Sequence, residues 1–349
     1  MTARLVVVGP GLMGLKHIEL IRANPRCALA GVVYPVAHRE PDVLRRLDAP
    51  VFDDLETCFA AGAPDGVIIA SPNPRHGDQA RFCIDRDVAV LIEKPITDDV
   101  SDGQRLCDLA EQRRARVLVG HHRAHSPIVQ TAVEVARSGR LGRIVGFQGS
   151  AAFYKPVEYF AAGPWRSQPG GGPVLINLIH EIGLMRAFCG EISGVHALAS
   201  HAVRQSAVED TVVINLQFAS GALGAFLLSD TAASASSWEQ TSGENPAFAA
   251  YPGEACYTLF GTRGALAIPT LDLKAHPPET PSSWLTPMTQ ERLAVDRLDP
   301  LTRQLDHFLD VLQHGAAPLV SARDGLANLI VTDAIRRSVA TGRFTPLAA

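Results

Sequence analysis

The chain has 349 residues, enough for two domains of ordinary size, and 46% of them are hydrophobic, which allows a buried core in each domain. The formal net charge of −4 leaves no basic excess for binding nucleic acid. No apolar stretch is long enough to cross a membrane, and the apolar run Leu5–Val8 is too short for a secretion signal. The six cysteines form no CxxC pair and the histidines no HExxH motif, so we expect reduced thiols, no metal site and a cytoplasmic protein.

The first third of the chain alternates short apolar runs with helical segments. We predict strands at 4–8, 28–34, 66–70, 88–92 and 117–119, and helices at 12–23, 54–61, 75–86 and 101–114. Strands that are apolar throughout are typical of a parallel sheet covered on both faces. The strand–helix repetition therefore predicts a doubly wound parallel sheet, a Rossmann domain that binds a dinucleotide, over residues 1–122.

The pattern changes after residue 122. We predict a helix at 127–138, strands at 144–153, 195–203, 211–218 and 222–230, a hairpin over 256–268, an irregular segment at 269–300, and helices at 301–314 and 323–341. Residues 123–349 are thus expected to form a second α/β domain, for the substrate, on an open, largely antiparallel sheet, its last helix free to pack back on the first domain. An open sheet needs a cover, and a homodimer or homotetramer through this sheet would supply one.

The turn after the first strand carries the pattern GxGxxG. Gly9 permits a tight turn, Gly11 permits close approach of a pyrophosphate, and Gly14 permits close packing of helix on strand. The start of the helix, with Leu12 and Met13, offers free backbone N–H groups and a positive dipole to phosphates. The sequence therefore predicts a dinucleotide at residues 9–14.

The choice between NAD and NADP depends on the end of the second strand. The acid that binds the ribose diol in NAD enzymes is expected about 20 residues after the glycines, and Tyr34 stands there instead. His38 and Arg39 offer positive charge for a 2′-phosphate, which favours NADP. Glu40 and Asp42 remain alternatives for a diol, so NAD stays open.

Two further turns follow strands of the predicted parallel sheet. Ser71, Pro72 and Asn73 follow one strand, and Glu93, Lys94 and Pro95 follow the next. Carboxyl ends of parallel strands are where open α/β sheets bind ligands. Lys94 is therefore expected to project over the nicotinamide, with its turn fixed by the proline.

With these motifs the chain resembles the Gfo/Idh/MocA oxidoreductase family along almost its whole length. The matching segments are GPGLMG at 9–14, ASPNPRH at 70–76, EKP at 93–95, HHRAHSP at 121–127, PWR at 164–166, GGGPVLINLIH at 170–180, GTRG at 261–264 and the stretch that begins at Ala322. The resemblance implies a nicotinamide cofactor, oxidation of a secondary alcohol on a sugar or cyclitol, and an oligomer. It also implies cofactor contacts from His76, Trp165 and Arg166, and a contact of Arg123 with substrate or nicotinamide.

The segment Gly170–Gly172 precedes a predicted helix at 174–188, on which Asn177 and His180 share one face. His180 matches the catalytic histidine of the family, and its imidazole can exchange the hydroxyl proton as hydride moves. Lys94 would stabilise negative charge on the substrate oxygen. The catalytic set is therefore Lys94, His180 and Asn177.

The sequence also departs from the family. Many members carry Asp where Ile176 stands, and Asn177 can bind a hydroxyl but cannot act as a base. A polyol substrate like that of the inositol dehydrogenases is thereby put in doubt. Tyr154 and Lys155, at the end of a strand, are expected to line the substrate pocket. An aromatic or semialdehyde substrate remains an alternative, as does a non-catalytic cofactor-binding sensor.

Overall fold

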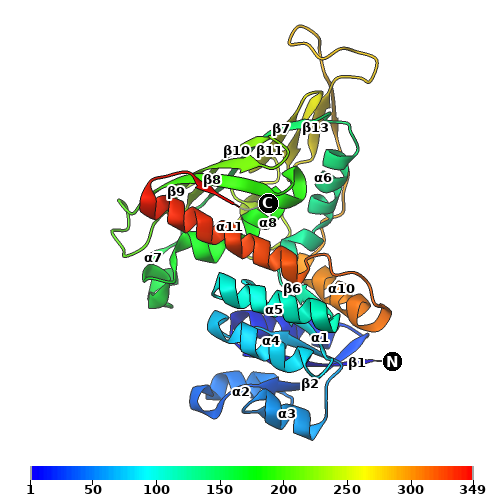
Figure 1. The fold of residues 1–349 in the computed structure, drawn as a ribbon, viewed down its shortest axis with the longest axis vertical. Helices are drawn as coiled ribbons and strands as arrows, with labels where there is room; N and C mark the ends of the chain where they lie inside the picture. Colours follow the sequence, from blue (N-terminus) through cyan, green and yellow to red (C-terminus); the bar gives the residue numbers. More distant parts are fainter. Residues whose placement is uncertain (1, 348–349) are drawn as a thin grey trace. The chain divides into compact units, whose positions relative to one another are not determined.

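The structure is a computed structural model that describes residues 2–347 (Figure 1). The chain divides into two compact units. The first contains residues up to His125 together with Pro300–Leu329, and the second contains Ser126–Asp299 together with the residues from Ile330 onward. The assignment of cofactor binding to residues 1–122 and of substrate binding to residues 123–349 stays a prediction.

Six parallel strands form the sheet of the first unit, in the order β3-β2-β1-β4-β5-β6. They are β1 (Ala3–Val8), β2 (Cys27–Val33), β3 (Val51–Phe52), β4 (Gly66–Ile69), β5 (Ala89–Ile92) and β6 (Val117–Val119). This order is that of a Rossmann sheet, and the predicted fold is confirmed. The order reverses between β1 and β4, so the turn after Val8 lies at the switch point where such sheets bind ligands.

Helices cover both faces of this sheet. They are α1 (Leu12–Ala23), α2 (Pro41–Leu47), α3 (Leu55–Ala61), α4 (His76–Ile84), α5 (Val100–Arg113) and α10 (Pro300–His314), with short 3-10 helices η1 (Val36–His38), η2 (Asn73–Arg75) and η3 (His122–His125). The core on one face joins Leu5, Val7 and Leu91 of the strands to Ile18 of α1 and Phe308 of α10. The alternate strand residues, such as Val6 and Ile69, are buried as well. Local sequence sets the helix starts: the Asp54 side chain, for example, accepts a hydrogen bond from Thr57 N and caps α3.

The second unit is built on a nine-stranded sheet with the order β14-β13-β12-β11-β7-β10-β9-β8-β15. Its strands are β7 (Ile144–Ala152), β8 (Ile192–Ser200), β9 (Thr211–Phe218), β10 (Leu223–Ser229), β11 (Tyr257–Gly261), β12 (Gly264–Ile268), β13 (Asp272–Ala275), β14 (Thr289–Arg292) and β15 (Thr345–Pro346). Among the described strand pairs of this sheet, only β7–β10 is parallel. The predicted open, largely antiparallel sheet is confirmed, and β9 and β10 pair through a turn at Ser220–Gly221.

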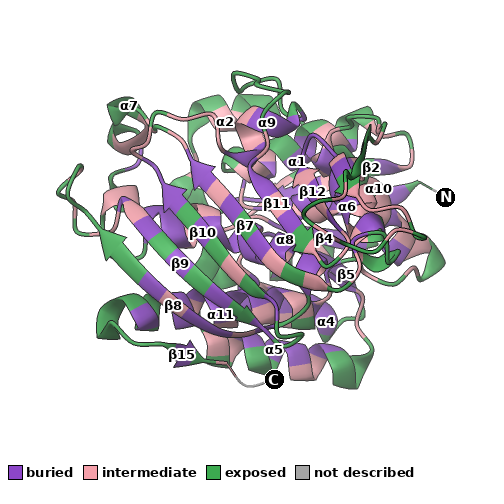
Figure 2. Cartoon of the chain, turned by 90° about the horizontal axis from the view of Figure 1, so that it is seen from above, coloured by how far each residue is buried: buried purple, intermediate pink, exposed green. Residues whose placement is uncertain are grey.

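One face of this sheet packs on helices. The second unit contains α6 (Pro127–Arg137), α7 (Val157–Ala161), the 3-10 helix η4 (Pro164–Ser167), the π-helix η5 (Val174–Leu178), α8 (Ile179–Cys189) and α9 (Trp238–Ser242), and α11 (Ala322–Thr341) runs into it. The core joins Phe147, Ile214 and Phe226 of the strands to Val129 of α6 and Met185 of α8. Buried and exposed residues alternate along β9, so its exposed residues lie on the other face of the sheet (Figure 2).

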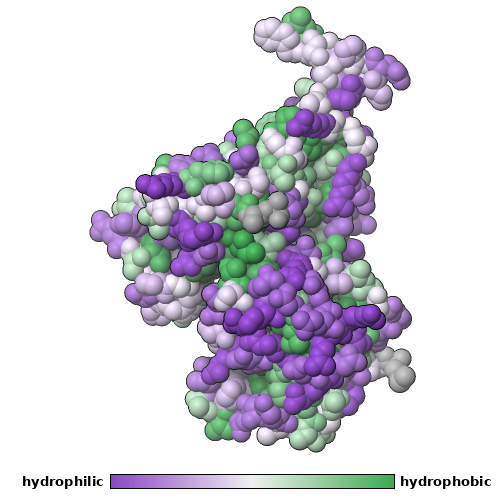
Figure 3. Space-filling view, in the orientation of Figure 1, coloured by the Kyte–Doolittle hydropathy of each residue, from purple (hydrophilic) through white to green (hydrophobic). Residues whose placement is uncertain are grey.

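The prediction that residues 269–300 are irregular is wrong in part, because β13 and β14 pair there as antiparallel strands. Both strands are four residues long and β14 is exposed throughout, so they lack the apolar pattern that identifies a strand in sequence. The segment between them stands out from the surface of its unit (Figure 3) and carries Trp284, which is 96% exposed. Among the described residues, no helix has the length and apolar character that crossing a bilayer requires.

Candidate functional site

The glycine turn of the first unit has the backbone geometry that a phosphate site needs. Gly9 has φ +85°, and a Cβ there would lie 2.7 Å from Ser71 Cα. A Cβ on Gly14 would lie 2.0 Å from Gly9 O, so the turn closes only with glycine at both positions. Gly11 begins α1 without a side chain to cap it, and a Cβ there would meet no other atom of residues 2–347 within 4 Å. The start of α1 is therefore open, and the turn fits the pyrophosphate of a dinucleotide.

Exposure of the next residues agrees with this fit. Leu12 is 85% exposed although it is apolar, and Met13 is partly buried beside it. An exposed apolar side chain at a helix start is consistent with a surface that a ligand covers.

The segment after β2 places Tyr34 and Arg39 together. Arg39 Nε donates to the Tyr34 carbonyl oxygen at 2.9 Å, and Arg39 Nη2 donates to Asp53 Oδ1 at 2.8 Å. The Tyr34 hydroxyl accepts from the backbone N–H of Glu40 at 2.9 Å. Asp53 was not found from the sequence. It follows β3, which pairs with β2, so the acid arrives from a neighbouring strand and not at the searched spacing.

His76 connects the two loops that follow β4 and β5. Its Nε2 lies 2.8 Å from the carbonyl oxygen of Ser71, and its Nδ1 lies 2.8 Å from that of Pro95. The side chain of Ser71 donates to Gln79 at 2.6 Å, while Pro72 and Asn73 lead into η2. The structure thus brings the predicted residues 71–76 and the turn at Lys94 into one network.

The turn at Lys94 rests on a buried ionisable pair. The Lys94–Pro95 peptide bond is cis. Glu93 is buried, and its Oε1 lies 2.7 Å from Nε2 of the equally buried His17 on α1. Burial alone would raise the pKa of Glu93, but the hydrogen bond and charge of His17, with the charges of His122 and Lys94, hold this pKa below its usual value. A role for His17 was not predicted from the sequence. The only signal for it was a histidine three residues after Gly14 in an otherwise apolar helix.

Arg123, a predicted contact of substrate or nicotinamide, lies in η3 and is buried. The neighbouring His125 Nε2 lies 3.1 Å from His307 Nδ1 on α10. Burial first, and then the charge of His307, lower the pKa of His125 to about 3. His125 is therefore neutral at physiological pH.

In the second unit, the segment Gly170–Gly172 is packed against protein. A Cβ on Gly171 would lie 2.6 Å from the carbonyl oxygens of both Trp165 and Arg166. A Cβ on Gly172, where φ is +82°, would lie 2.6 Å from Glu209 Oε1. Glu209 in turn accepts from the backbone N–H of Val174 at 3.0 Å. The glycines therefore hold the Trp165 turn against the start of the helix that bears Asn177.

This helix differs from the predicted one. Residues Val174–Leu178 form a π-helix, and α8 begins only at Ile179. Asn177 lies in the π segment and His180 is the second residue of α8; both are half-buried. Single π turns within α-helices occur often at functional sites, because they redirect side chains.

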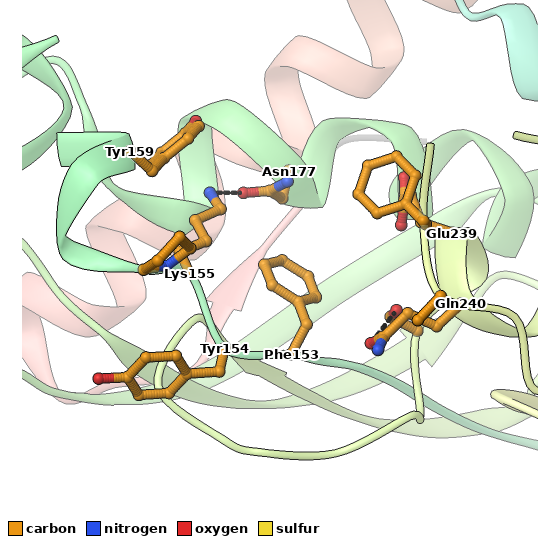
Figure 4. Close-up of a pocket in the computed structure, with 11 residues that line it drawn as sticks. Phe153, Tyr154, Lys155, Tyr159, Asn177, Glu239 and Gln240 are labelled. Atoms are coloured by element: carbon orange, nitrogen blue, oxygen red, sulfur yellow. Dashed lines mark hydrogen bonds between the residues drawn. The ribbon is translucent and has the colours of Figure 1, made fainter. Parts of the chain in front are cut away.

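Asn177 lines a pocket of about 420 Å³ (Figure 4). The other lining residues come from the segment that follows β7 and from residues 237–249. Lys155 Nζ donates to Asn177 Oδ1 at 2.6 Å and lies 4.7 Å from the centre of the Tyr159 ring. Burial first lowers the pKa of Lys155, and the charges of Arg204 and Arg166 add to this, to give a pKa of about 8. The pocket also contains Phe153, Tyr154 and Glu239.

The structure thus brings together the predicted Tyr154 and Asn177 with Lys155. Trp165 is exposed, and the Arg166 guanidinium stacks 4.1 Å from the centre of the Tyr159 ring. His180 is not among the described residues that line this pocket. Glu209, Arg204 and Asp230 were not predicted from the sequence. Nothing in the local sequence around a buried charged residue reveals its partner.

Comparisons with known proteins agree with this architecture. Residues 3–121 match the oxidoreductase family with an NAD-binding Rossmann fold, and residues 129–267 match the GFO/IDH/MocA C-terminal domain. The chain is 23% identical to the inositol 2-dehydrogenase of Rhizobium meliloti over 100% of both chains, and 25% identical to D-xylose 1-dehydrogenase (NADP(+)) 2 of Haloferax volcanii over 98% of both. Its fold is similar to that of the WlbA dehydrogenase of Bordetella pertussis, solved with NADH and UDP-GlcNAcA (TM-score 0.77, 22% identity, 100% of each chain). Because both halves match in order, the chain belongs to the Gfo/Idh/MocA family of NAD(P)-dependent oxidoreductases.

Proposed function

We propose that this chain transfers hydride between a nicotinamide and a secondary alcohol or carbonyl group of a small sugar, cyclitol or related hydroxy compound. The observation that carries the proposal is the open turn Gly9–Gly14 at the switch point of a sheet whose neighbouring strands lead to Lys94. A bound nicotinamide would supply the acceptor or donor of the hydride. The residues of the chain would bind the substrate and move its hydroxyl proton.

Three residues carry the proposed chemistry. Lys94 binds the substrate oxygen and stabilises negative charge there. His180 takes the hydroxyl proton during oxidation and gives it back during reduction. Asn177 hydrogen-bonds the substrate and exchanges no proton, and Ile176 beside it adds only apolar surface.

The cofactor is held by backbone and side chains that surround the glycine turn. The N–H groups at Gly11–Gly14 bind the pyrophosphate. Further contacts come from Ser71, Pro72, Asn73, His76 and Glu93, and from Trp165 and Arg166 of the second unit.

Arg39 is the proposed determinant of a preference for NADP. Its guanidinium lies beside Tyr34, where a 2′-phosphate would add a second acidic partner. The existing bond from Arg39 to Asp53 opposes this preference, because the acid already neutralises part of its charge. We therefore expect NADPH to bind only a few times more tightly than NADH, consistent with about 1 kcal/mol for a partly exposed ion pair.

Titration with NADPH and NADH, followed by nicotinamide fluorescence, tests cofactor binding. A substrate panel with Lys94→Ala and His180→Ala then tests the chemistry. Each variant is expected to lose about 10²- to 10⁴-fold in kcat while it keeps its affinity for the cofactor. His201→Ala, at an exposed position of the second unit, is the matched control. Failure of both cofactors to bind, or full activity of His180→Ala, would refute the assignment.

One observation favours an aromatic or semialdehyde substrate as a second candidate. The pocket at Asn177 is lined by four aromatic side chains, those of Phe153, Tyr154, Tyr159 and Phe248. A panel sorted by hydroxyl count distinguishes the two classes. Turnover that rises with the number of hydroxyl groups supports the sugar class, and the opposite order supports the aromatic class.

We further propose that identical chains associate through the open face of the nine-stranded sheet. The strand register places Leu198, Val213 and Leu227 in one row across β8, β9 and β10, and all three are exposed. Leu223 and Phe260 both pair with Gly146 in the strand register and extend the apolar surface along the same face. Val213→Lys should convert a dimer or tetramer to smaller species in analytical ultracentrifugation. A wild-type chain that sediments as a monomer at all concentrations would refute this.

The proposed compartment is the cytoplasm. All six cysteines are buried and unpaired, as in proteins of reducing compartments.

A further inference from the structure

The pair Lys155–Asn177 presents only hydrogen-bond donors to its pocket. A lysine ammonium cannot accept a hydrogen bond, so Asn177 must turn its Oδ1 toward Lys155. Its amide nitrogen is thereby directed away from Lys155 (Figure 4). Within residues 2–347, two N–H groups of Lys155 and two of Asn177 have no other hydrogen-bond partner, so a ligand that binds there must supply acceptors.

The donor pair is fixed in place by a second layer of interactions. The backbone N–H of Lys155 donates to the Asp230 carbonyl oxygen at 2.9 Å, and its carbonyl oxygen accepts from Arg204 at 2.9 Å. Arg204 Nε donates to Asp230 Oδ1 at 2.7 Å, in a pair that is almost fully buried. Lys155 therefore approaches Asn177 from a rigid support, which lowers the entropy lost when a ligand binds.

No carboxylate of residues 2–347 is paired with the Lys155 ammonium. Asp230, the acid that acts on it most strongly, already accepts a hydrogen bond from Arg204. Among the described residues, no acidic side chain lies within ion-pair distance of Lys155 Nζ, which bonds to Asn177 instead. Desolvation of this ammonium already lowers the pKa of Lys155, so a bound anion would relieve an existing cost.

The remaining walls suit a compact hydroxylated ring. Tyr159 and Phe153 flank Lys155 Nζ, at 4.7 and 5.5 Å from their ring centres, and offer flat apolar faces. Glu239 lines another side and can accept from ligand hydroxyls. The volume of about 420 Å³ is that of a small-molecule site.

From this geometry we infer that the enzyme acts on an acid: a sugar or cyclitol that carries a carboxylate, bound by Lys155 and the amide nitrogen of Asn177. The inference rests on the proposed function and narrows its substrate class. Lys155 is then a specificity-determining residue that selects the acid over the neutral compound of the same size.

The test compares matched pairs of compounds that differ in the carboxylate. The probes are D-glucuronate against D-glucose, D-galacturonate against D-galactose, and quinate against myo-inositol, each with saturating cofactor. The acid-to-neutral ratio of kcat/KM is measured for wild type, Lys155→Met and Lys155→Arg. Lys274→Met, an exposed lysine of β13, is the matched control. Calorimetric binding of each acid to the protein–cofactor complex is measured in parallel.

A charge-assisted contact of this kind should favour the acid about 10- to 100-fold. Lys155→Met should abolish the acid-to-neutral preference in kcat/KM, because it raises the KM of the acid. Lys155→Arg should keep part of this preference, and Lys274→Met should keep all of it. A purely structural role of Lys155 would lower both members of a pair alike and overturns the inference.

The outcomes separate this inference from the proposed function. If the neutral compounds are turned over and the acids are not, the oxidoreductase assignment stands and the acid inference fails. If acids bind to wild type but not to Lys155→Met, and no compound is turned over, the acid site stands and the proposed reaction fails. If acids neither bind nor react, the inference is refuted.

Discussion

Replacement of Gly11 by alanine separates folding from cofactor binding. Gly11 has φ −72° and ψ −165°, an extended conformation that alanine adopts without strain. The added Cβ would meet no atom within 4 Å among the described residues. A glycine-to-alanine change at such a position stabilises a protein by about 0.4–1 kcal/mol, because it restricts the unfolded chain. Gly11→Ala should therefore unfold at the same temperature as wild type or slightly above it.

The same methyl group should weaken binding of the dinucleotide. It would occupy the space through which a pyrophosphate reaches the N–H groups of α1. Overpacking of one methyl group costs about 1–3 kcal/mol, which corresponds to roughly 5- to 150-fold in Kd. Fluorescence titration with NADH and NADPH measures this loss, and differential scanning calorimetry measures the stability.

Two companion variants make the result decisive. Gly253→Ala, in an open loop position of the second unit, should leave both stability and cofactor affinity near wild type. Gly14→Ala should destabilise the fold itself, because its Cβ would lie 2.0 Å from Gly9 O. A stable Gly11→Ala protein that binds both cofactors as tightly as wild type would show that no phosphate sits at this turn, and the reasoning would be wrong.

Three further predictions concern other parts of the molecule. Arg39→Ala should reduce the ratio of NADPH to NADH affinity, with the exposed Arg45→Ala as control; equal loss for both cofactors would contradict the role of Arg39. Gly171→Ala should lower the free energy of unfolding by about 1–3 kcal/mol, since its Cβ would lie 2.6 Å from backbone oxygen, and an unchanged Tm would contradict this packing. For an acidic substrate, kcat/KM should fall as the pH rises through about 8, because burial lowers the pKa of Lys155 to this value, helped by Arg204 and Arg166 and opposed by Asp230 and Glu239. The same fall with a neutral substrate, or its persistence in Lys155→Arg, would assign the titration to another group.

The fold could be predicted from sequence because its signals are local. Strands β1, β2, β4, β5 and β6 of the first sheet were predicted from short apolar runs, whereas the two-residue strand β3 was not predicted. The turn at Gly9 has the glycine spacing that its backbone geometry requires. The alternation along Thr211–Phe218 identified a strand with one exposed face. The hairpin β13–β14 escaped prediction, because an exposed four-residue strand such as Thr289–Arg292 buries nothing that would leave a pattern.

The site was predictable only where one residue carries the signal. Lys94 and His180 stand in recognisable motifs. The partners of other predicted residues come from distant segments: His17 meets Glu93 across 76 residues, and Asp53 reaches Arg39 from a neighbouring strand. Lys155 could be placed at a strand end, but its contact with Asn177 depends on a π turn. Tertiary packing determines side-chain pairs of this kind, so no characteristic spacing in the sequence identifies them.

The chain has two glycine motifs, the first at Gly9–Gly14 and the second at Gly170–Gly172. They look alike in sequence but have different roles. In the second motif, the space of a Cβ at Gly171 or Gly172 is filled by protein, and Gly170 is required by its φ of +95°. In the first motif, protein fills the space at Gly9 and Gly14 in the same way. Of the glycines in the two motifs, Gly11 alone combines an ordinary conformation with empty space among the described residues, so the fold gives no reason for glycine there. Gly253, in a loop of the second unit, has the same properties, so open space alone does not indicate a ligand. Gly11 also stands at the start of α1, at the switch point of the sheet, and for this reason it connects the fold most directly to the proposed function.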